Sequence, residues 1–367
     1  MNLPKSAYIH IPFCSSICGY CDFCKLLYRP DWAEEYLFSL KKEICDSLPK
    51  EGALFETIYV GGGTPTSLED EEFRSFLLFL SSFLAKGGEF TVEANPESLS
   101  ESKAKIMAEA GVNRLSVGLE SSHPTRLAQM GRRHRPEDVA ACLKRARENG
   151  IANLNVDLIY ALPGETMAEL KEDIAYLLSL GATHISTYSL TIPEGTIFHN
   201  RGYREASEDD SADQYEEILR ELRAAGYERY EVSNFAKPGF RSRHNQCYWK
   251  DEEYYGFGLG ASGYVGGVRY TNVKSLSSYL KGKRRAEEEK VTPKDDLEYF
   301  LLTNLRLSDG FSLTRFEKRF GFSFDSHFKE SKERMIREGL LVEEGGFLRA
   351  SDHGMEILDR ILLALFP

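Results

Sequence analysis

The sequence predicts an α/β fold: a partial parallel (β/α)6 barrel of the TIM type followed by a small winged-helix-like α+β domain. Three features of the 367-residue chain lead to this prediction. Short β-branched segments alternate with helical segments over residues 1–230, as in a parallel sheet covered by helices. Residues 231–290 form an extension rich in aromatic residues and glycine. Residues 291–367 change to helices followed by a hairpin.

The first strand–helix unit is a strand that ends at Pro12, a cysteine-bearing loop, and a helix from Asp31 to about Ser47. Asp31 and Glu34 have the spacing of a capping box. Five more units follow, and Ser100 and Pro136 have the residue types of helix starts. The expected strands are 57–60, 89–93, 114–118, 153–157 and 184–188, and the expected helices are 67–85, 100–110, 136–150, 167–181 and 208–225.

Gly266 and Gly267 predict a hairpin in the extension, and the charged run 281–290 predicts a solvated linker. The last domain is expected to hold helices over roughly 293–306, 313–320 and 325–338, a hairpin around residues 345–346, and a final helix ending at residue 365. Helices with a hairpin wing commonly read DNA. Because this domain has 11 basic and 14 acidic residues, a net charge of 11 − 14 = −3, we interpret it as a protein-contact or substrate-covering module.

Charge and hydropathy exclude several classes of function. The net charge of −11 argues against nonspecific nucleic-acid binding, which requires a basic face, and offers no polybasic membrane anchor. The N-terminal residues lack the apolar core of a secretory signal, and no apolar run could span a bilayer. We therefore expect a cytoplasmic protein, with any membrane contact peripheral and transient.

The densest chemical signal is the loop that follows the first strand, where Cys14, Cys18 and Cys21 have the spacing C-x3-C-x2-C. Cysteine thiolates are the soft ligands of iron–sulfur clusters, so three of them can hold three corners of a 4Fe-4S cubane and leave the fourth iron open. A zinc site completed by His10 is the alternative, although paired knuckles are the usual zinc spacing. We expect Cys24 to lie off the cluster.

Polar residues follow the other predicted strands. The carboxyl ends of parallel strands meet at one mouth, where ligands of such folds bind. A glycine loop with Gly62, Gly63 and Thr64 follows the second strand, and glycines allow a close approach of backbone to a ligand. The further candidates are Glu93, Glu120, Asp157, Thr191 and Arg132. Their alternative is that the acids are solvated rim residues and that Arg132 belongs to a surface basic cluster.

The stretch Y-x-H-I-P-F-C-x3-C-x-Y-C, from Tyr8 to Cys21, resembles the opening of radical S-adenosylmethionine (SAM) proteins of the oxygen-independent coproporphyrinogen III oxidase group, which includes a haem chaperone family. The G-G-G-T-P-T loop and the D-L-I-Y-A-L-P-G segment extend the resemblance to residue 164. The resemblance implies that one or two SAM molecules contact Tyr8, Tyr20, Gly62, Gly63, Thr64, Glu93, Arg132 and Asp157. Glu120 stands where related proteins carry glutamine, and a carboxylate there removes an amide donor from the second SAM site.

A second motif, H-N-Q-C-Y-W, contains His244 and Cys247. Both are candidate haem ligands, because a flat apolar macrocycle suits aromatic surroundings with an axial ligand. The alternative is a buried histidine and tryptophan that brace a glycine-rich turn. The motif resembles the haem chaperone branch, as does the short segment before the cysteines.

Two functions follow from the resemblance. The first is a haem chaperone that carries a 4Fe-4S cluster and SAM, binds haem as cargo and transfers it to acceptor apo-haemoproteins of respiration. The alternative is a coproporphyrinogen III oxidase (dehydrogenase), which decarboxylates propionates in porphyrin biosynthesis; a radical route to haem breakdown is a weaker third possibility. The expected partners are haem or porphyrin and an electron donor, and SAM cleavage is compatible with either function.

Overall fold

The computed structural model describes residues 3–49 and 54–366, so the prediction for the N-terminal segment falls partly outside the described residues. It contains a nine-stranded sheet with the order β11-β1-β4-β5-β6-β7-β8-β10-β9. The expected six-strand parallel order is confirmed. These six strands are β1 (Ser6–Ile11), β4 (Phe55–Gly62), β5 (Leu84–Ala94), β6 (Arg114–Glu120), β7 (Asn153–Tyr160) and β8 (His184–Ser189).

Three strands from the region after residue 225 extend this sheet at both edges. β11 (Tyr255–Phe257) pairs in parallel with β1, whereas β10 (Asn234–Ala236) is antiparallel to both β8 and β9 (Glu228–Arg229). The two outer strands do not pair with each other, so the sheet is a partial barrel. β10 and β11 follow residue 230 and still belong to the large sheet, so the sheet itself does not mark a boundary there. The domain limits at residues 230 and 290 stay a prediction.

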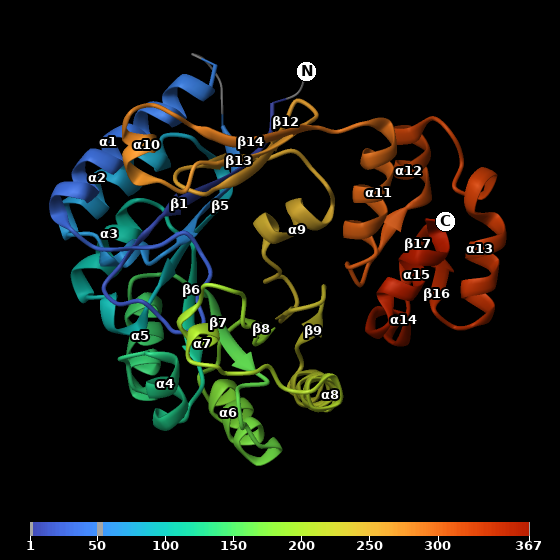
Figure 1. Cartoon of the computed structure of the whole chain (residues 1–367), viewed down its shortest axis with the longest axis horizontal. Helices are drawn as coiled ribbons and strands as arrows, with labels where there is room; N and C mark the ends of the chain where they lie inside the picture. Colours follow the sequence, from blue (N-terminus) through green and yellow to red (C-terminus); the bar gives the residue numbers. More distant parts are fainter. Residues whose placement is uncertain (1–2, 50–53, 367) are drawn as a thin grey trace.

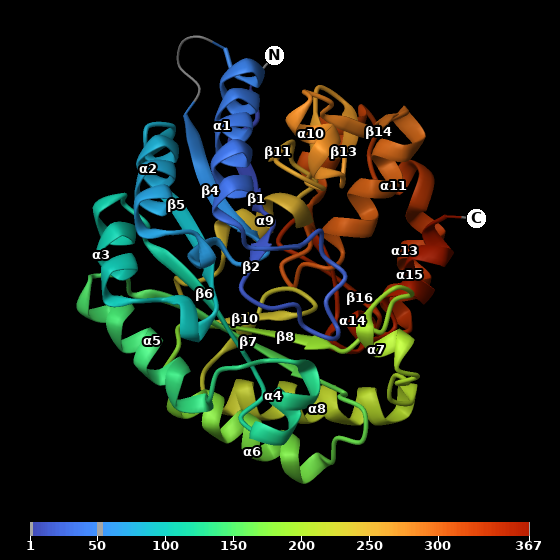
Figure 2. The same ribbon diagram turned by 60° about the vertical axis from the view of Figure 1, so that its left-hand side comes forward.

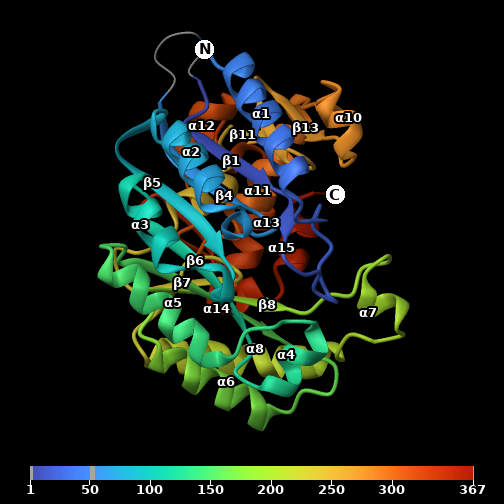
Figure 3. The same cartoon turned by 90° about the vertical axis from the view of Figure 1, so that its left-hand side faces the viewer.

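The strands direct apolar side chains outward and polar ones inward, because side chains alternate along a strand. Val60, Val92, Val117 and Val156 are fully buried against the outer helices. These helices cover one face of the sheet and curve around it (Figures 2 and 3). They are α1 (Pro30–Ser47), α2 (Asp70–Ser81), α3 (Glu101–Glu109), α5 (Pro136–Glu148), α6 (Met167–Ser179) and α8 (Glu208–Ala224).

The inward face carries residues that can bind polar ligands. In the register of the sheet, Glu93 pairs with Ser116, Ser116 with Asn155, and Asp157 with Ser186. The barrel interior is therefore lined by hydrogen-bonding groups, whereas the interior of a closed TIM barrel is packed with branched apolar residues.

Several local predictions were wrong. The capping box at residues 31–34 does not form, because Pro30 occupies the first helical turn and Arg29 is the N-cap. The second helix ends at Ser81, and residues 84–88 already belong to strand β5. The charged run 281–290 is not a linker throughout: its last six residues form β14 (Arg285–Lys290). That strand pairs with β13 at the edge of a small sheet, where exposed charged side chains are suitable.

The remaining extension packs beside the large sheet, at the top of Figure 1. The predicted Gly266–Gly267 hairpin is confirmed, since β12 (Ser262–Val265) and β13 (Val268–Asn272) flank it. Short elements complete the first 290 residues: β2 (Phe13–Cys14), β3 (Leu26–Leu27), η1 (Pro65–Ser67), η2 (Pro96–Ser98), α4 (Pro124–Met130), α7 (Ile197–Asn200), α9 (Arg243–Trp249) and α10 (Leu276–Leu280).

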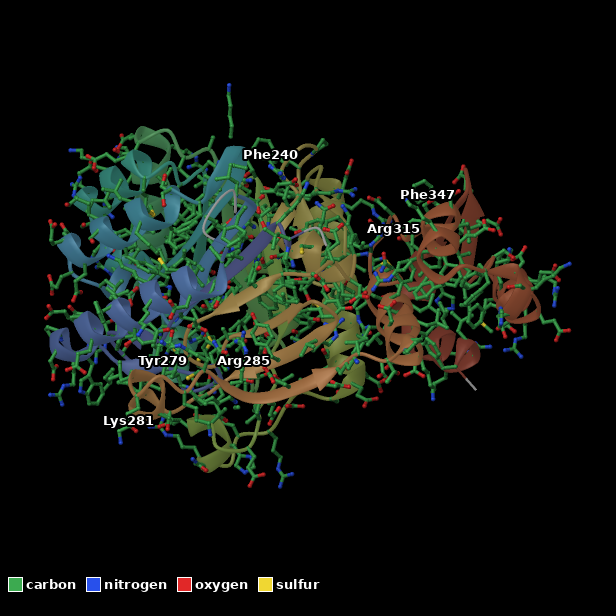
Figure 4. All side chains as sticks on the ribbon, turned by 90° about the horizontal axis from the view of Figure 1, so that it is seen from above. Phe240, Tyr279, Lys281, Arg285, Arg315 and Phe347 are labelled. Carbon is green, nitrogen blue, oxygen red and sulfur yellow. The ribbon has the colours of Figure 1, made fainter. Side chains whose placement is uncertain are left out.

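The C-terminal module has a separate core around Phe300 and Phe316, and it lies to the right of the sheet in Figure 1. In Figure 4, Arg315 lies where the module meets the rest of the protein, and its guanidinium donates to the Lys250 carbonyl. The three predicted helices and the hairpin are confirmed. The elements are α11 (Pro293–Asn304), β15 (Phe311–Ser312), α12 (Leu313–Phe320), α13 (Asp325–Arg337), β16 (Leu341–Glu344), β17 (Phe347–Ala350), α14 (Asp352–Glu356) and α15 (Leu358–Leu365).

Across the described residues, every helix is too short or too polar to cross a membrane.

Candidate cluster and cofactor site

A cavity of about 380 Å³ lies at the carboxyl ends of the parallel strands and reaches into the barrel. The cysteine loop forms one wall and the glycine loop another. The structure brings most of the predicted site residues together here. Those that line the cavity are Cys14, Cys18, Tyr20, Cys21, Gly62, Gly63, Thr64, Glu93, Glu120, Arg132, Asp157 and Thr191.

Backbone contacts hold the cysteine loop against the barrel. β2 and β3 pair at its base, where Leu26 N–H donates to the Pro12 carbonyl at 2.7 Å. At its tip, Gly19 N–H donates to the Met130 carbonyl at 2.8 Å. Gly63 packs directly on the chain entering the loop, because a Cβ there would lie 2.7 Å from the Phe13 carbonyl oxygen. The glycine loop is therefore close enough to fix the position of Cys14.

The three cavity-lining thiols fit a 4Fe-4S cluster. Burial raises the pKa of Cys14 to about 11 and also raises the pKa values of Cys18 and Cys21. Among residues 3–49 and 54–366, no three His, Cys, Asp or Glu side chains converge on one metal-ion position. A cubane does not need such convergence, because each cysteine binds a different iron at a different corner. These three residues would hold the cluster.

Cys24 lies elsewhere. Its sulfur is 3.8 Å from the Lys274 carbonyl oxygen, and the side chain does not line the cavity. The backbone carbonyl of Cys24 is held by His10 Nε2 at 2.7 Å. This geometry supports the prediction that Cys24 is not a cluster ligand.

A chain of hydrogen bonds joins the glycine loop to strand β6. Asn95 donates to Thr64 Oγ1 at 3.1 Å and accepts from Arg132 Nη1 at 2.8 Å. Arg132 also forms a buried ion pair with Glu120, which accepts from the Tyr20 hydroxyl at 3.1 Å. Arg132 is thus no surface residue. Glu120 has φ of 65°, in the left-handed region where non-glycine residues are strained, and such strain concentrates at functional sites.

Two further carboxyl groups face the cavity. Glu93 accepts hydrogen bonds from the Tyr59 hydroxyl at 2.7 Å and from Gly62 N–H at 3.0 Å, and burial raises its pKa. Burial, together with the charges of Glu120 and Glu93, raises the pKa of Asp157 to about 7. Buried carboxyl groups with raised pKa values lower the stability of the folded protein at neutral pH. Proteins commonly retain such groups at functional sites, so their presence in one cavity indicates a functional site.

Replacing Asp157 by asparagine is expected to stabilise the ligand-free protein at pH 8. The folded pKa of about 7 exceeds the ordinary value of 3.8, so the folded state retains a proton that the unfolded chain loses as the pH rises from 4 to 7. Wild-type stability falls over that range, by about 4 kcal/mol from this group. Melting temperatures of both proteins at pH 5 and pH 8 test this. An equal pH dependence in the two proteins contradicts it.

Tyr8 does not line the cavity. Its hydroxyl lies 3.0 Å from His10 Nδ1, and the ring is half-buried. Burial lowers the pKa of His10 to about 4, so this histidine is neutral. Tyr8 and His10 thus connect strand β1 to the backbone of the cysteine loop at the Cys24 carbonyl.

His244 and Cys247 are also outside the cavity. His244 is 1 % exposed; its Nδ1 lies 2.8 Å from Thr57 Oγ1 and its Nε2 lies 2.7 Å from the Tyr248 hydroxyl. Burial lowers the pKa of His244 to about 3, and the ring is neutral. Cys247 is 3 % exposed and near backbone carbonyls. Haem ligation by either residue would require this packing to open, so their assignment stays a prediction without support from the geometry.

The sequence interpretation missed cavity residues deeper in the barrel. Alternation along β6, β7 and β8 was the available signal, since polar residues recur at every second position over most of these strands. Asn245, in the motif that drew attention to its two neighbours, also lines the cavity. The missed residues include Tyr59, Arg114, Ser116, Asn155, Ser186, Tyr188 and Asn245.

Comparison with known families agrees with the geometry. Residues 8–177 match the Radical SAM superfamily, and residues 291–357 match the HemN C-terminal domain. Curated relatives that carry the name heme chaperone HemW include proteins from three bacteria. The Bacillus subtilis protein is 40% identical over 92% of both chains, and the Lactococcus lactis protein is 40% identical over 97% of this chain and 96% of its own. The Escherichia coli protein is 30% identical over 98% of this chain and 97% of its own.

The same architecture occurs in a solved structure. Coproporphyrinogen III oxidase (HemN) from Escherichia coli, described as a radical SAM enzyme, superposes with a TM-score of 0.86 over 99% of this chain and 90% of its own. The sequence identity is 22%, so this likeness concerns the fold. It includes the C-terminal module as well as the partial barrel.

Proposed function

The chain belongs to the heme chaperone HemW family of radical SAM proteins, and from this membership we propose that it binds haem and transfers it to acceptor apo-haemoproteins. The observation that carries the proposal is 40% identity over nearly the whole length of two relatives named heme chaperones. The similarity extends through the C-terminal module. We further propose a cytoplasmic location, because unpaired thiols in a cluster loop require a reducing compartment.

Radical SAM membership implies a 4Fe-4S cluster and SAM, and we propose the residues that hold them. Cys14, Cys18 and Cys21 are the proposed cluster ligands; when bound, the cluster supplies an electron for the reductive cleavage of SAM. The protein itself positions and encloses the ligand. Gly62 and Gly63 admit it close to backbone, Glu93 and Asp157 offer acceptors, and the pair formed by Arg132 and Glu120 offers one group of each charge.

The proposal is tested by loading and transfer. The protein, reconstituted anaerobically, is titrated with haem while the Soret band is recorded, and the loaded protein is then mixed with an apo-form of a b-type cytochrome. We expect a stoichiometric complex and the appearance of the cytochrome spectrum. Failure of the wild-type protein to bind haem would overturn the proposal.

The alternative function has its own readout. Incubation with coproporphyrinogen III, SAM and a reductant followed by mass analysis reports on loss of carboxyl groups. Decarboxylated product would replace the chaperone proposal by the oxidase function. We expect no decarboxylated product, because the two relatives that are 40% identical over nearly the whole chain are named heme chaperones.

A further inference from the structure

The floor of the cavity contains a buried arginine that forms no ion pair with the described residues. Arg114 is the first residue of β6, lines the cavity and is 1 % exposed. Its Nε has no hydrogen-bond partner, and no carboxylate among residues 3–49 and 54–366 forms an ion pair with it. An uncompensated charge in a protein interior costs several kcal/mol, so a partner for this guanidinium is expected.

The neighbouring side chains are engaged elsewhere. His184 holds Asn155 and the Tyr230 hydroxyl through its two ring nitrogens, at 2.6 and 2.8 Å, and is neutral because burial and then Arg114 lower its pKa. His244 is equally occupied and neutral. Glu93 accepts its hydrogen bonds from Tyr59 and Gly62; the charge of Arg114 acts to lower its pKa, but the two groups form no ion pair.

Arg114 lies far below the cluster loop. It precedes Glu120 by six residues in the same strand, which corresponds to roughly 20 Å of strand length. Between them, Ser116 and Gly118 also line the cavity. The guanidinium is therefore separate from Arg132, whose charge is neutralised by Glu120 at the mouth.

A second free donor comes from the H-N-Q-C-Y-W motif. Asn245 on α9 lines the same cavity, and its side-chain amide makes no hydrogen bond to the described residues. Its backbone N–H donates to Ser242 Oγ at 3.2 Å, at the start of the helix. Its neighbour His244 does not line the cavity and joins α9 to β4 through Thr57. The motif thus combines a packed histidine with an asparagine whose amide is available to a ligand.

We propose that Arg114 and Asn245 form a carboxylate-binding subsite on the cavity floor. This inference rests on the proposed function. It adds a second ligand-binding point to the cavity, apart from the cluster loop. A guanidinium fork binds carboxylate or phosphate in a bidentate manner. The acids Glu93, Glu120 and Asp157 around the upper cavity repel a doubly charged phosphate more strongly than a single carboxylate. The carboxylate has two available sources: the amino-acid end of a SAM molecule or a propionate of haem.

Arg114→Met separates a ligand-binding role from a structural one by the sign of the stability change. Removal of an unpaired buried charge is expected to raise the melting temperature of the ligand-free protein. Arg229→Met is the control, because the side chain of Arg229 is 6 % exposed but pairs with the exposed Asp352 at 3.1 Å, so its loss should lower the melting temperature. If Arg114→Met lowers the melting temperature as the control does, Arg114 is structural and the proposal is wrong.

Binding measurements on the anaerobically reconstituted full-length protein identify the source. One arm titrates SAM by calorimetry and follows the cluster by EPR; if SAM supplies the carboxylate, Arg114→Met weakens a second class of SAM site on the order of 100-fold and retains the cluster-bound one. The other arm compares haem with haem dimethyl ester; if haem supplies it, Arg114→Met abolishes the preference for haem. Unchanged binding in both arms overturns the proposal.

Asn245 provides an independent variant that retains the arginine. Asn245→Asp places a negative charge beside the bound carboxylate, so it should weaken binding of the same probe more than Asn245→Ala does. Equal effects of the two variants contradict a role for Asn245. A wild-type protein that binds no haem refutes the proposed function alone, since the SAM arm and the melting temperatures still report on Arg114.

Discussion

Replacing Cys14 by serine is expected to remove nearly all cluster iron from the reconstituted protein. A serine hydroxyl is a hard, weakly acidic ligand where the cluster requires a thiolate. The loss should exceed the roughly 10–100-fold effects that follow from removing outer contacts of a metal site. Iron and sulfide content per chain, with the visible absorbance of the cluster, provides the measurement. The serine variants of Cys18 and Cys21 should behave in the same way.

Cys24→Ser is the matched control within the same loop. Its sulfur faces the Lys274 carbonyl and not the cavity, so iron content should remain that of the wild-type protein. If Cys24→Ser loses the cluster while Cys14→Ser keeps it, the proposed ligand set is wrong. If both lose it, Cys24 is also required, and the site would be closed to SAM.

The cysteine loop was accessible to sequence reasoning because its signal is local. Ligand spacing, a preceding strand and a glycine loop after the next strand are all visible in short segments, and the parallel topology then brings them to one edge. Strand β14 was not accessible in this way. Arg285–Lys290 has the composition of a solvated segment, and only pairing with β13 makes it a strand. β-structure at an edge depends on its partner more than on its own sequence.

The H-N-Q-C-Y-W motif shows a second limit of sequence reasoning. Spacing on a short helix places His244 and Asn245 on different sides, but the sequence does not say which side faces the cavity. The histidine is a candidate haem ligand by its chemistry, and a packed structural histidine is the alternative. The structure buries His244 against Thr57 and Tyr248 and turns Asn245 toward the cavity. Residue chemistry alone therefore drew attention to His244 and not to Asn245, the residue of the motif that lines the cavity.

Glu43→Ala is expected to cause the largest loss of stability among substitutions of buried residues in helix α1. Glu43 is 3 % exposed and joins α1 to the extension. It accepts from Gly258 N–H at 3.0 Å, from Asn272 Nδ2 at 2.9 Å and from the Tyr279 hydroxyl. Figure 4 shows Tyr279 beside the N-terminal helices. Alanine leaves these donors buried and deprived of their acceptor, at a cost on the order of 4 kcal/mol.

Thermal unfolding of the ligand-free protein measures this effect, with Glu35→Ala as control on the exposed face of the same helix. The control should change the melting temperature little. The consequence should also reach the cluster loop, because the neighbouring Tyr36 hydroxyl donates to the His10 carbonyl at 2.6 Å and accepts from Leu259 N–H at 3.0 Å. Hydrogen exchange should therefore increase in β1 and β11 together. An increase confined to α1 would mean that the extension is held by its apolar contacts, and that Glu43 does not couple it to the strand that carries the cysteines.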